Sequence, residues 1–253
     1  MQFIHRWYDQ LPASIRSSFR RLLPDNFLRW YANRKTDVYL ISYPKCGRTW
    51  LRLMIGKTIA NHFNLPENED TILLRWKRKV HPQVEHITVV HDNRPMLKTP
   101  DELEKSKNQY AGKKVIFLVR DPRDVIVSSY FELKHRSKLF SNNPQENQSD
   151  LIDQGLHDFI FQERSGIDTI IQYFNIWAEN RQAPKAFLLV RYEDLRAEPH
   201  RQLRQIMDFL GLDEISAQTI DQAVDFASFD NMRKMEMEEK YQSEMLKPAN
   251  RLD

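Results

Sequence analysis

The feature that most constrains this chain is a short apolar strand that runs through a tight turn into a long apolar helix. The strand is expected over residues 37–42, D-V-Y-L-I-S, a run typical of a buried strand in a parallel sheet. The helix is expected over residues 49–64, where Leu51, Ile55 and Ile59 recur at helical spacing. Further apolar residues on its sides indicate that this helix is covered on most of its circumference.

The turn between the strand and the helix, Y-P-K-C-G-R-T-W over residues 43–50, predicts an anion site. The first backbone N–H groups of a helix lack partners and lie at the positive end of its dipole, where phosphate and sulfate bind. Gly47 permits close approach of the backbone, and Lys45 adds a mobile charge. Thr49 is expected to cap the helix and to offer its hydroxyl to the same anion. An ordinary turn with a surface lysine is the alternative.

A nucleotide P-loop is the obvious rival for this turn. In that motif, G-x-x-x-x-G-K-[ST], the lysine follows the last glycine, whereas Lys45 precedes Gly47 here. The triplet Gly56-Lys57-Thr58 does spell the end of the motif. It lies inside the predicted helix with no glycine-rich loop before it, so we interpret it as a coincidence.

The turn resembles the 5′-phosphosulfate loop of the sulfotransferases that use 3′-phosphoadenosine 5′-phosphosulfate (PAPS). The usual form of that loop is Y-P-K-S-G-T-T-W, so Cys46 replaces a serine and Arg48 replaces a threonine. The resemblance implies that the phosphosulfate is held by a continuous run of residues, namely Lys45, Cys46, Gly47, Arg48, Thr49 and Trp50.

A second strand is expected over residues 86–90, and it ends at His91. Because the carboxyl ends of parallel strands form the ligand crevice, His91 is expected at the same sheet edge as Lys45. In the resembling family a histidine here is the general base, usually within K-T-H. In this chain Val89 and Val90 precede the histidine, so the family's lysine is absent.

Histidines recur at positions 81, 86 and 91, which raises the alternative of a metal site. An odd spacing along a strand sends successive side chains to opposite faces, and no cysteine or carboxylate cluster completes a coordination shell. No metal is therefore expected.

A third strand, over residues 114–119, delivers the run R-D-P-R-D-V-I-V-S-S-Y. Asp121 in this run could be a magnesium-holding carboxylate of a nucleotide kinase. The run also resembles the family's 3′-phosphate motif, which implies that Arg120 and Ser128 hold the 3′-phosphate. A guanidinium is a planar, permanently charged fork suited to that group.

Two later segments add to the resemblance. A fourth strand, over residues 186–190, leads into Y-E-D-L, and the family's tyrosine at this point contacts the adenine, which implies that role for Tyr192. The segment A-S-F at residues 227–229 resembles the family's T-S-F, so Ser228 and Phe229 are carried over as nucleotide-site residues. Weaker patterns predict an extended piece over 71–76 and a short helix over 103–108.

The chain is expected to hold one large domain, residues 36–253, preceded by a basic amphipathic segment, residues 1–35. We expect that segment to pack on its own domain; a peripheral membrane contact is the alternative. Family members continue past T-S-F into a basic segment, commonly R-K-G, that covers the nucleotide. Residues 247–253 end where that segment should begin, so we expect it to be missing here or supplied by a partner.

Composition narrows the partners. Lys plus Arg exceed Asp plus Glu by 38 − 35 = 3 and the charges are interspersed, so no nucleic-acid partner is indicated. One cysteine excludes an internal disulfide, and no stretch is long enough to span a membrane, which favours the cytoplasm.

The sequence as a whole predicts a three-layer αβα domain with a central, mainly parallel sheet, of the P-loop nucleotide-kinase-like class. The resemblance implies transfer of a sulfuryl group from PAPS, leaving adenosine 3′,5′-bisphosphate, to a hydroxyl or amine of a small molecule. His91 would be the general base and Lys45 would assist the leaving group. An ATP-dependent small-molecule kinase and a non-catalytic PAPS-binding module are the alternatives. The acceptor itself is not predicted; its pocket is expected to involve residues 65–85 and 134–165.

Overall fold

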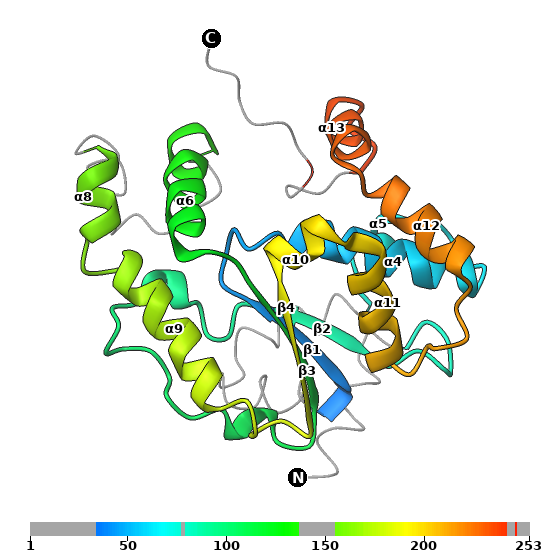
Figure 1. Cartoon of the computed structure of the whole chain (residues 1–253), viewed down its shortest axis with the longest axis horizontal. Coiled ribbons are helices and arrows are strands. Elements are labelled where there is room, and N and C mark those ends of the chain that lie inside the picture. Colours follow the sequence, from blue (N-terminus) through cyan, green and yellow to red (C-terminus); the bar gives the residue numbers. More distant parts are fainter. Residues whose placement is uncertain (1–33, 77–78, 137–154, 242–245, 247–253) are drawn as a thin grey trace, which may run out of the picture. The chain divides into compact units, whose positions relative to one another are not determined.

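The computed structural model describes residues 34–76, 79–136, 155–241 and 246. Its centre is a parallel sheet of four strands in the order β2-β1-β3-β4 (Figure 1). The strands are β1 (Val38–Ser42), β2 (Ile87–Val90), β3 (Lys114–Val119) and β4 (Ala186–Arg191). Every pairing is parallel, and β1 lies between β2 and β3. All four predicted strands are confirmed, and β3 has the predicted bounds.

Helices cover both faces of the sheet, which confirms the three-layer arrangement (Figure 1). One group contains α4, α5, α10, α11, α12 and α13, and the other contains α6, α8 and α9. Their bounds are α4 (Arg48–His62), α5 (Glu69–Ile72), α6 (Pro122–Arg136), α8 (Leu156–Phe161), α9 (Ile167–Glu179), α10 (Tyr192–Ala197), α11 (Pro199–Phe209), α12 (Ala217–Phe226) and α13 (Phe229–Met237).

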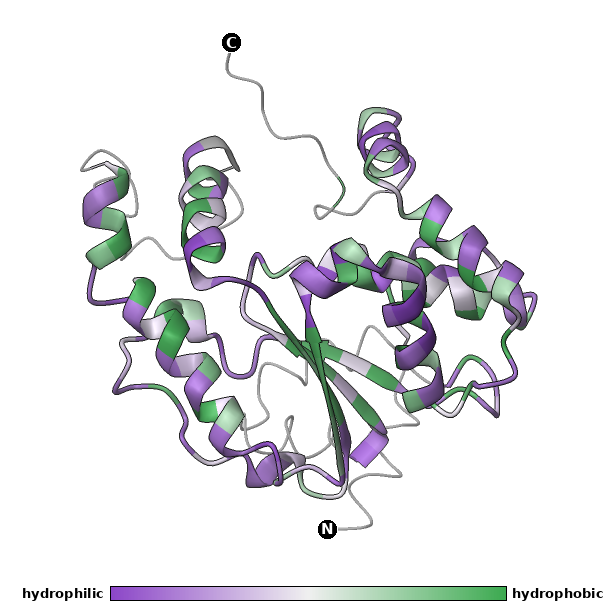
Figure 2. Cartoon of the chain, in the orientation of Figure 1, coloured by the Kyte–Doolittle hydropathy of each residue, from purple (hydrophilic) through white to green (hydrophobic). Residues whose placement is uncertain are grey.

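The core is continuous from the sheet into these helices. The five residues of β1 are buried, and α4 carries Leu51, Met54 and Ile55 with no solvent exposure. Figure 2 shows the strands as largely hydrophobic, whereas hydrophobic and hydrophilic residues are mixed along the helices. The prediction that α4 is covered on most sides is confirmed, because apolar residues on several of its faces are buried.

Two weaker predictions are wrong. Residues 71–76 are not extended: α5 includes Thr71, whose backbone N–H is bonded by the side chain of Asn68, so a local cap overrides the β-propensity of the segment. Residues 103–107 are not helical, and only a 3₁₀ turn, Asn108–Tyr110, follows them. There the buried Lys107 Nζ reaches Asp92 at 2.8 Å, so tertiary contacts determine the backbone.

The chain divides into two compact units, residues 1–36 and 37–253. Of the first unit only residues 34–36 are described, so the expected packing of the N-terminal segment remains a prediction. Residues 247–253, where the nucleotide-covering segment was expected to be missing, also lie outside the described residues. Residues 137–154, part of the 134–165 region expected at the acceptor pocket, are likewise outside them.

Candidate active site

The turn after β1 forms the centre of the site. Gly47 has a left-handed backbone, φ 88°, and is the N-cap of α4. The first backbone bond of the helix runs from the N–H of Leu51 to the Gly47 carbonyl at 3.1 Å, so the N–H groups of Arg48, Thr49 and Trp50 precede it. This is the geometry of an anion-binding helix start. The prediction that Thr49 caps the helix is wrong, because the helix begins one residue earlier.

A tyrosine ring explains why this cap is a glycine. A Cβ atom on Gly47 would lie 2.5 Å from Cδ2 of Tyr192, closer than real Cβ contacts come. Tyr192 begins α10 at the end of β4, and its ring also meets Trp50 edge-on at 5.8 Å. The structure therefore brings Tyr192 to the turn at residues 43–50, and its expected contact with the adenine remains a prediction.

Arg120, at the end of β3, joins the same cluster. Its guanidinium lies 4.5 Å from the centre of the Tyr192 ring, and its Nη1 donates to the Lys45 carbonyl at 3.2 Å. A second contact, 3.3 Å to Asp124, is on the solvent side. The Nε of Arg120 is buried and has no hydrogen-bond partner in the described part of the chain.

Lys45 pairs with an acidic side chain that the sequence did not single out. Its Nζ lies 2.9 Å from Glu132 Oε2, on α6. Ser128 lies one helical turn before Glu132, on the same face of α6, and is half-buried; its contact with the 3′-phosphate remains a prediction. Eighty-seven positions separate Lys45 from Glu132, and no local sequence pattern signals such a pair.

His91 is held between β1 and α4. Its Nδ1 lies 2.9 Å from the Ser42 carbonyl and its Nε2 lies 2.6 Å from Nη2 of Arg48. Since a carbonyl only accepts, Nδ1 carries the proton and Nε2 keeps a lone pair. Burial and, after it, the charge of Arg48 lower the pKa of His91 to about 3. The imidazole is therefore neutral across the physiological range.

The remaining predicted residues play different parts. Burial raises the pKa of Cys46 to about 12, so this thiol is a packing residue and not a thiolate. Ser228 is the N-cap of α13, where its hydroxyl accepts from Asn231 N–H at 3.4 Å, and Phe229 is 79% exposed. No contact within the described residues joins Ser228 or Phe229 to the loop, so their roles remain predictions.

A buried network of hydrogen bonds and one ion pair lies next to His91, and no sequence pattern indicated it. Asp92 is fully buried and accepts hydrogen bonds from Tyr110 (2.6 Å), Trp177 (3.0 Å) and Gln109 (3.1 Å), besides its ion pair with Lys107. The three residues after His91 all have left-handed φ angles between 50° and 65°. The Asp92 carboxylate thus anchors an unusual backbone directly after the candidate base.

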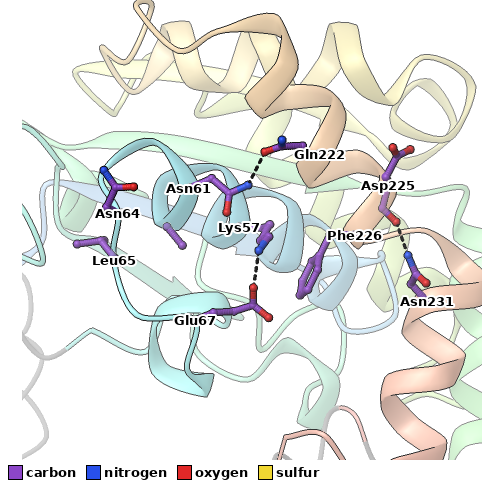
Figure 3. A pocket seen from close by; sticks show the side chains of 10 residues that line it. Lys57, Asn61, Asn64, Leu65, Glu67, Gln222, Asp225, Phe226 and Asn231 are labelled. Carbon is purple, nitrogen blue, oxygen red and sulfur yellow. Dashed lines mark hydrogen bonds and ion pairs between the residues drawn. The ribbon is translucent and has the colours of Figure 1, made fainter.

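The Gly56-Lys57-Thr58 triplet has no P-loop geometry. A Cβ on Gly56 would lie 2.3 Å from the Ile72 carbonyl, and Thr58 donates to the Met54 carbonyl at 2.8 Å, so both residues serve helix packing. Lys57 points across a groove of about 810 Å³ and pairs with Glu67 (Figure 3). The triplet therefore lies in the interior of α4, which agrees with the interpretation that its resemblance to a P-loop is a coincidence.

The structure bears on two alternatives raised by the sequence, a magnesium-holding role for Asp121 and a metal site at the recurring histidines. The Asp121 carboxylate is bonded by the side chain and backbone N–H of Arg123 in the same turn, at 3.0 and 2.9 Å from Nε and N. His86, the middle histidine, is buried with its Nε2 3.0 Å from the Trp76 carbonyl. Over the described residues no cluster of three His, Cys, Asp or Glu side chains could hold a metal, and no helix has the length and apolarity to cross a membrane.

Fold and site together define an α/β domain in which a turn with the geometry of an anion-binding helix start, two arginines and a histidine lie at the carboxyl edge of a parallel sheet. The chain belongs to the sulfotransferase domain family, whose model matches residues 35–251.

Individual relatives are distant. The chain is 25% identical over 223 residues to cytosolic sulfotransferase 17 of Arabidopsis thaliana. The matched region covers 82% of this chain and 62% of that protein. It is 26% identical over 230 residues to flavonol 3-sulfotransferase of Flaveria bidentis, covering 86% and 70%. Its fold is similar to a crystal structure of retinol dehydratase in complex with androsterone and inactive cofactor PAP, with a TM-score of 0.50 and 19% identity over 79% of this chain and 66% of the other. The chain thus spans less than two thirds of the length of several relatives it matches.

Proposed function

We propose that this chain transfers a sulfuryl group from PAPS to a hydroxyl or amine of a small-molecule acceptor in the cytoplasm, leaving adenosine 3′,5′-bisphosphate. One observation carries the proposal: Nε2 of His91 lies 2.6 Å from Arg48, the first residue of α4, so a neutral base and an anion-binding helix start share one site. The name of the Arabidopsis relative, a cytosolic sulfotransferase, supports the same class and location.

The residues around the loop suit this donor. The N–H groups at the start of α4 and the ammonium of Lys45 would hold the 5′-phosphosulfate. Arg120 and Ser128 would hold the 3′-phosphate. The buried Nε of Arg120, which has no hydrogen-bond partner among the described residues, supports an anionic ligand at that position. The ring of Tyr192 would pack on the adenine.

The proposed transfer needs one base and a stabilised leaving group. His91 Nε2 accepts the proton of the acceptor hydroxyl while the hydroxyl oxygen forms a bond to sulfur. The bond from sulfur to the bridging phosphate oxygen breaks, and its electron pair stays on the phosphate. Lys45 and the helix N–H groups stabilise the charge that grows there. The scheme uses these fixed cations and no metal ion.

Two rival functions are less well supported. A kinase would need the Gly56-Lys57-Thr58 triplet in a loop, but these residues lie inside α4. A non-catalytic PAPS-binding module would not need His91 to point at the loop. Its contact with Arg48 therefore favours a catalytic role.

The test combines nucleotide binding with turnover. Calorimetry should show binding of adenosine 3′,5′-bisphosphate in preference to ATP, and radiolabelled PAPS should label at least one acceptor in a panel of phenols, hydroxylated lipids, sugars and amines. His91→Ala should reduce turnover by about 10²–10⁴-fold with nucleotide affinity unchanged, because only the general base is lost. His200→Ala, at an exposed histidine on α11, is the control. Preferred binding of ATP, or full turnover by His91→Ala, would contradict the proposal.

A further inference from the structure

Arg48 forms a hydrogen bond with Nε2 of His91, the atom that the proposed reaction needs as its base. Nδ1 of His91 donates to the Ser42 carbonyl, so the one lone pair of the ring is on Nε2, and the guanidinium of Arg48 donates to it at 2.6 Å. An acceptor hydroxyl that gives its proton to His91 must come to the same place. Arg48 must therefore either exchange partners or lie directly beside the reacting oxygen.

The charge of Arg48 has no acidic counter-ion in the part of the chain that the structure describes. Among the described residues, no carboxylate lies within 4.0 Å of its guanidinium. The groups that face it include the thiol of Cys46 and the phenol of Tyr173 on α9, both uncharged at neutral pH, and the cation Arg52. Its Nη1 is buried and has no hydrogen-bond partner within the described ranges. Burial lowers the pKa of Arg48 to about 10, so the side chain remains a cation. A buried cation with an unused donor is costly unless an anion joins it.

The side chain also spans the two ends of the proposed reaction. Its backbone N–H opens α4, where the phosphate is expected, and its tip reaches His91, where the acceptor is expected. The sulfuryl group has to lie between these two points during transfer. The guanidinium is therefore the cation best placed to meet the sulfuryl oxygens.

We propose that Arg48 is a catalytic residue of this chain, which binds the sulfuryl oxygens during transfer and thereby releases Nε2 of His91 to take the acceptor proton. This inference rests on the proposed function. It assigns a charged role to a position at which the resembling loop usually has a threonine. Proton and electron flow are those of the proposed transfer: the acceptor proton goes to His91, and Arg48 exchanges one hydrogen-bond acceptor for another.

The test compares two nucleotides that differ by the sulfuryl group. Affinities for PAPS and for adenosine 3′,5′-bisphosphate are measured for the wild type, Arg48→Thr and Arg48→Lys, with thermal unfolding as the folding check. Arg48→Thr should leave adenosine 3′,5′-bisphosphate binding within about twofold, weaken PAPS binding and reduce kcat by about 10²–10³-fold, the usual effect of losing one transition-state donor. Arg48→Lys keeps the charge without the planar guanidinium. Its PAPS affinity and kcat should lie between those of the wild type and of Arg48→Thr.

The pH profile gives a second readout that a merely structural residue would not change. His91 faces the cations Arg48 and Arg52 of α4 and the Ser42 carbonyl of β1. Removing one of these cations favours protonated His91 and raises its pKa, so the acid limb of kcat/KM should move to higher pH in Arg48→Thr and not in Arg48→Lys.

The outcomes separate the two proposals. If the wild type bound neither nucleotide, the proposed function would fall, and the role of Arg48 with it. If the wild type bound and turned over normally while Arg48→Thr weakened both nucleotides equally, or turned over faster than the wild type, Arg48 would be a packing residue or a brake on His91. Either result would overturn this inference alone.

Discussion

Replacing Lys107 by methionine tests whether the buried network beside His91 holds the fold. The Nζ of Lys107 lies 2.8 Å from Asp92 Oδ2, and the two side chains are 2% and 0% exposed. Methionine fills a similar volume but leaves the Asp92 carboxylate buried without its counter-ion. Loss of one partner of a buried pair costs about 3–5 kcal/mol.

Three neutral donors place the expected value at the lower end of that range. Tyr110, Trp177 and Gln109 still donate to Asp92 in the variant, and bonds to a charged group are worth about 1.5–3 kcal/mol each. We therefore expect a loss of about 3 kcal/mol in the free energy of unfolding, or a fall in Tm of roughly 6–12 °C for a chain of this size.

Urea unfolding followed by circular dichroism measures this loss. Arg201→Met removes an exposed pair with Glu198, whose side chains are 73% and 54% exposed, and should cost under about 1 kcal/mol. The double variant Lys107→Met with Asp92→Asn removes both buried charges and should be more stable than Lys107→Met alone. The reasoning is refuted if Lys107→Met costs no more than Arg201→Met, or if the double variant is the less stable one.

Three further predictions concern the loop and its partners. Gly47→Ala should weaken adenosine 3′,5′-bisphosphate binding and lower Tm, because its Cβ would lie 2.5 Å from a tyrosine ring; Gly112→Ala, also at positive φ but with no atom within 4 Å, is the control and should change only Tm. Arg120→Ala should cost about 1.5–3 kcal/mol in calorimetric binding of adenosine 3′,5′-bisphosphate and much less for AMP, which lacks the 3′-phosphate; equal losses would remove Arg120 from that role. Glu132→Gln should tighten binding of adenosine 3′,5′-bisphosphate by up to about fivefold, since Lys45 loses a competing anion in a partly exposed pair; weaker binding would mean that Glu132 orients the lysine instead.

The strands could be predicted from sequence because each is a short, predominantly apolar run, and β1, β2 and β3 consist mostly of β-branched or aromatic residues. Residues 114–119 lie between a glycine turn and a proline that starts α6, and the structure gives β3 the same bounds. Parallel topology then predicted the site, since residues at the carboxyl ends of such strands meet at one edge. His91, Arg120 and Tyr192 each follow a strand by this rule, and each contacts a residue of the turn at 43–50 or packs against it.

Side-chain pairing at that edge could not be predicted, because a sequence does not show which charged residues are buried. Lys107 lies in the segment predicted to be a short helix, residues 103–108, and no sequence pattern singled out Glu132. Folding buries the first against Asp92 and brings the second to Lys45.

The resulting distribution of charge at the site bears on the order in which its cations exchange partners. Lys45 and Arg120 each lie within 3.3 Å of a carboxylate, Glu132 and Asp124 respectively, and both pairs are partly exposed to solvent. Among the described residues, Arg48 contacts the neutral imidazole of His91, its charged neighbour is the cation Arg52, and no carboxylate lies within 4.0 Å of its guanidinium. A phosphosulfate entering the site must displace a carboxylate to bind Lys45, but it meets no such competitor at Arg48. Of the two residues that depart from the usual loop, Cys46 and Arg48, the second is therefore the one whose charge would be most available to a sulfuryl group.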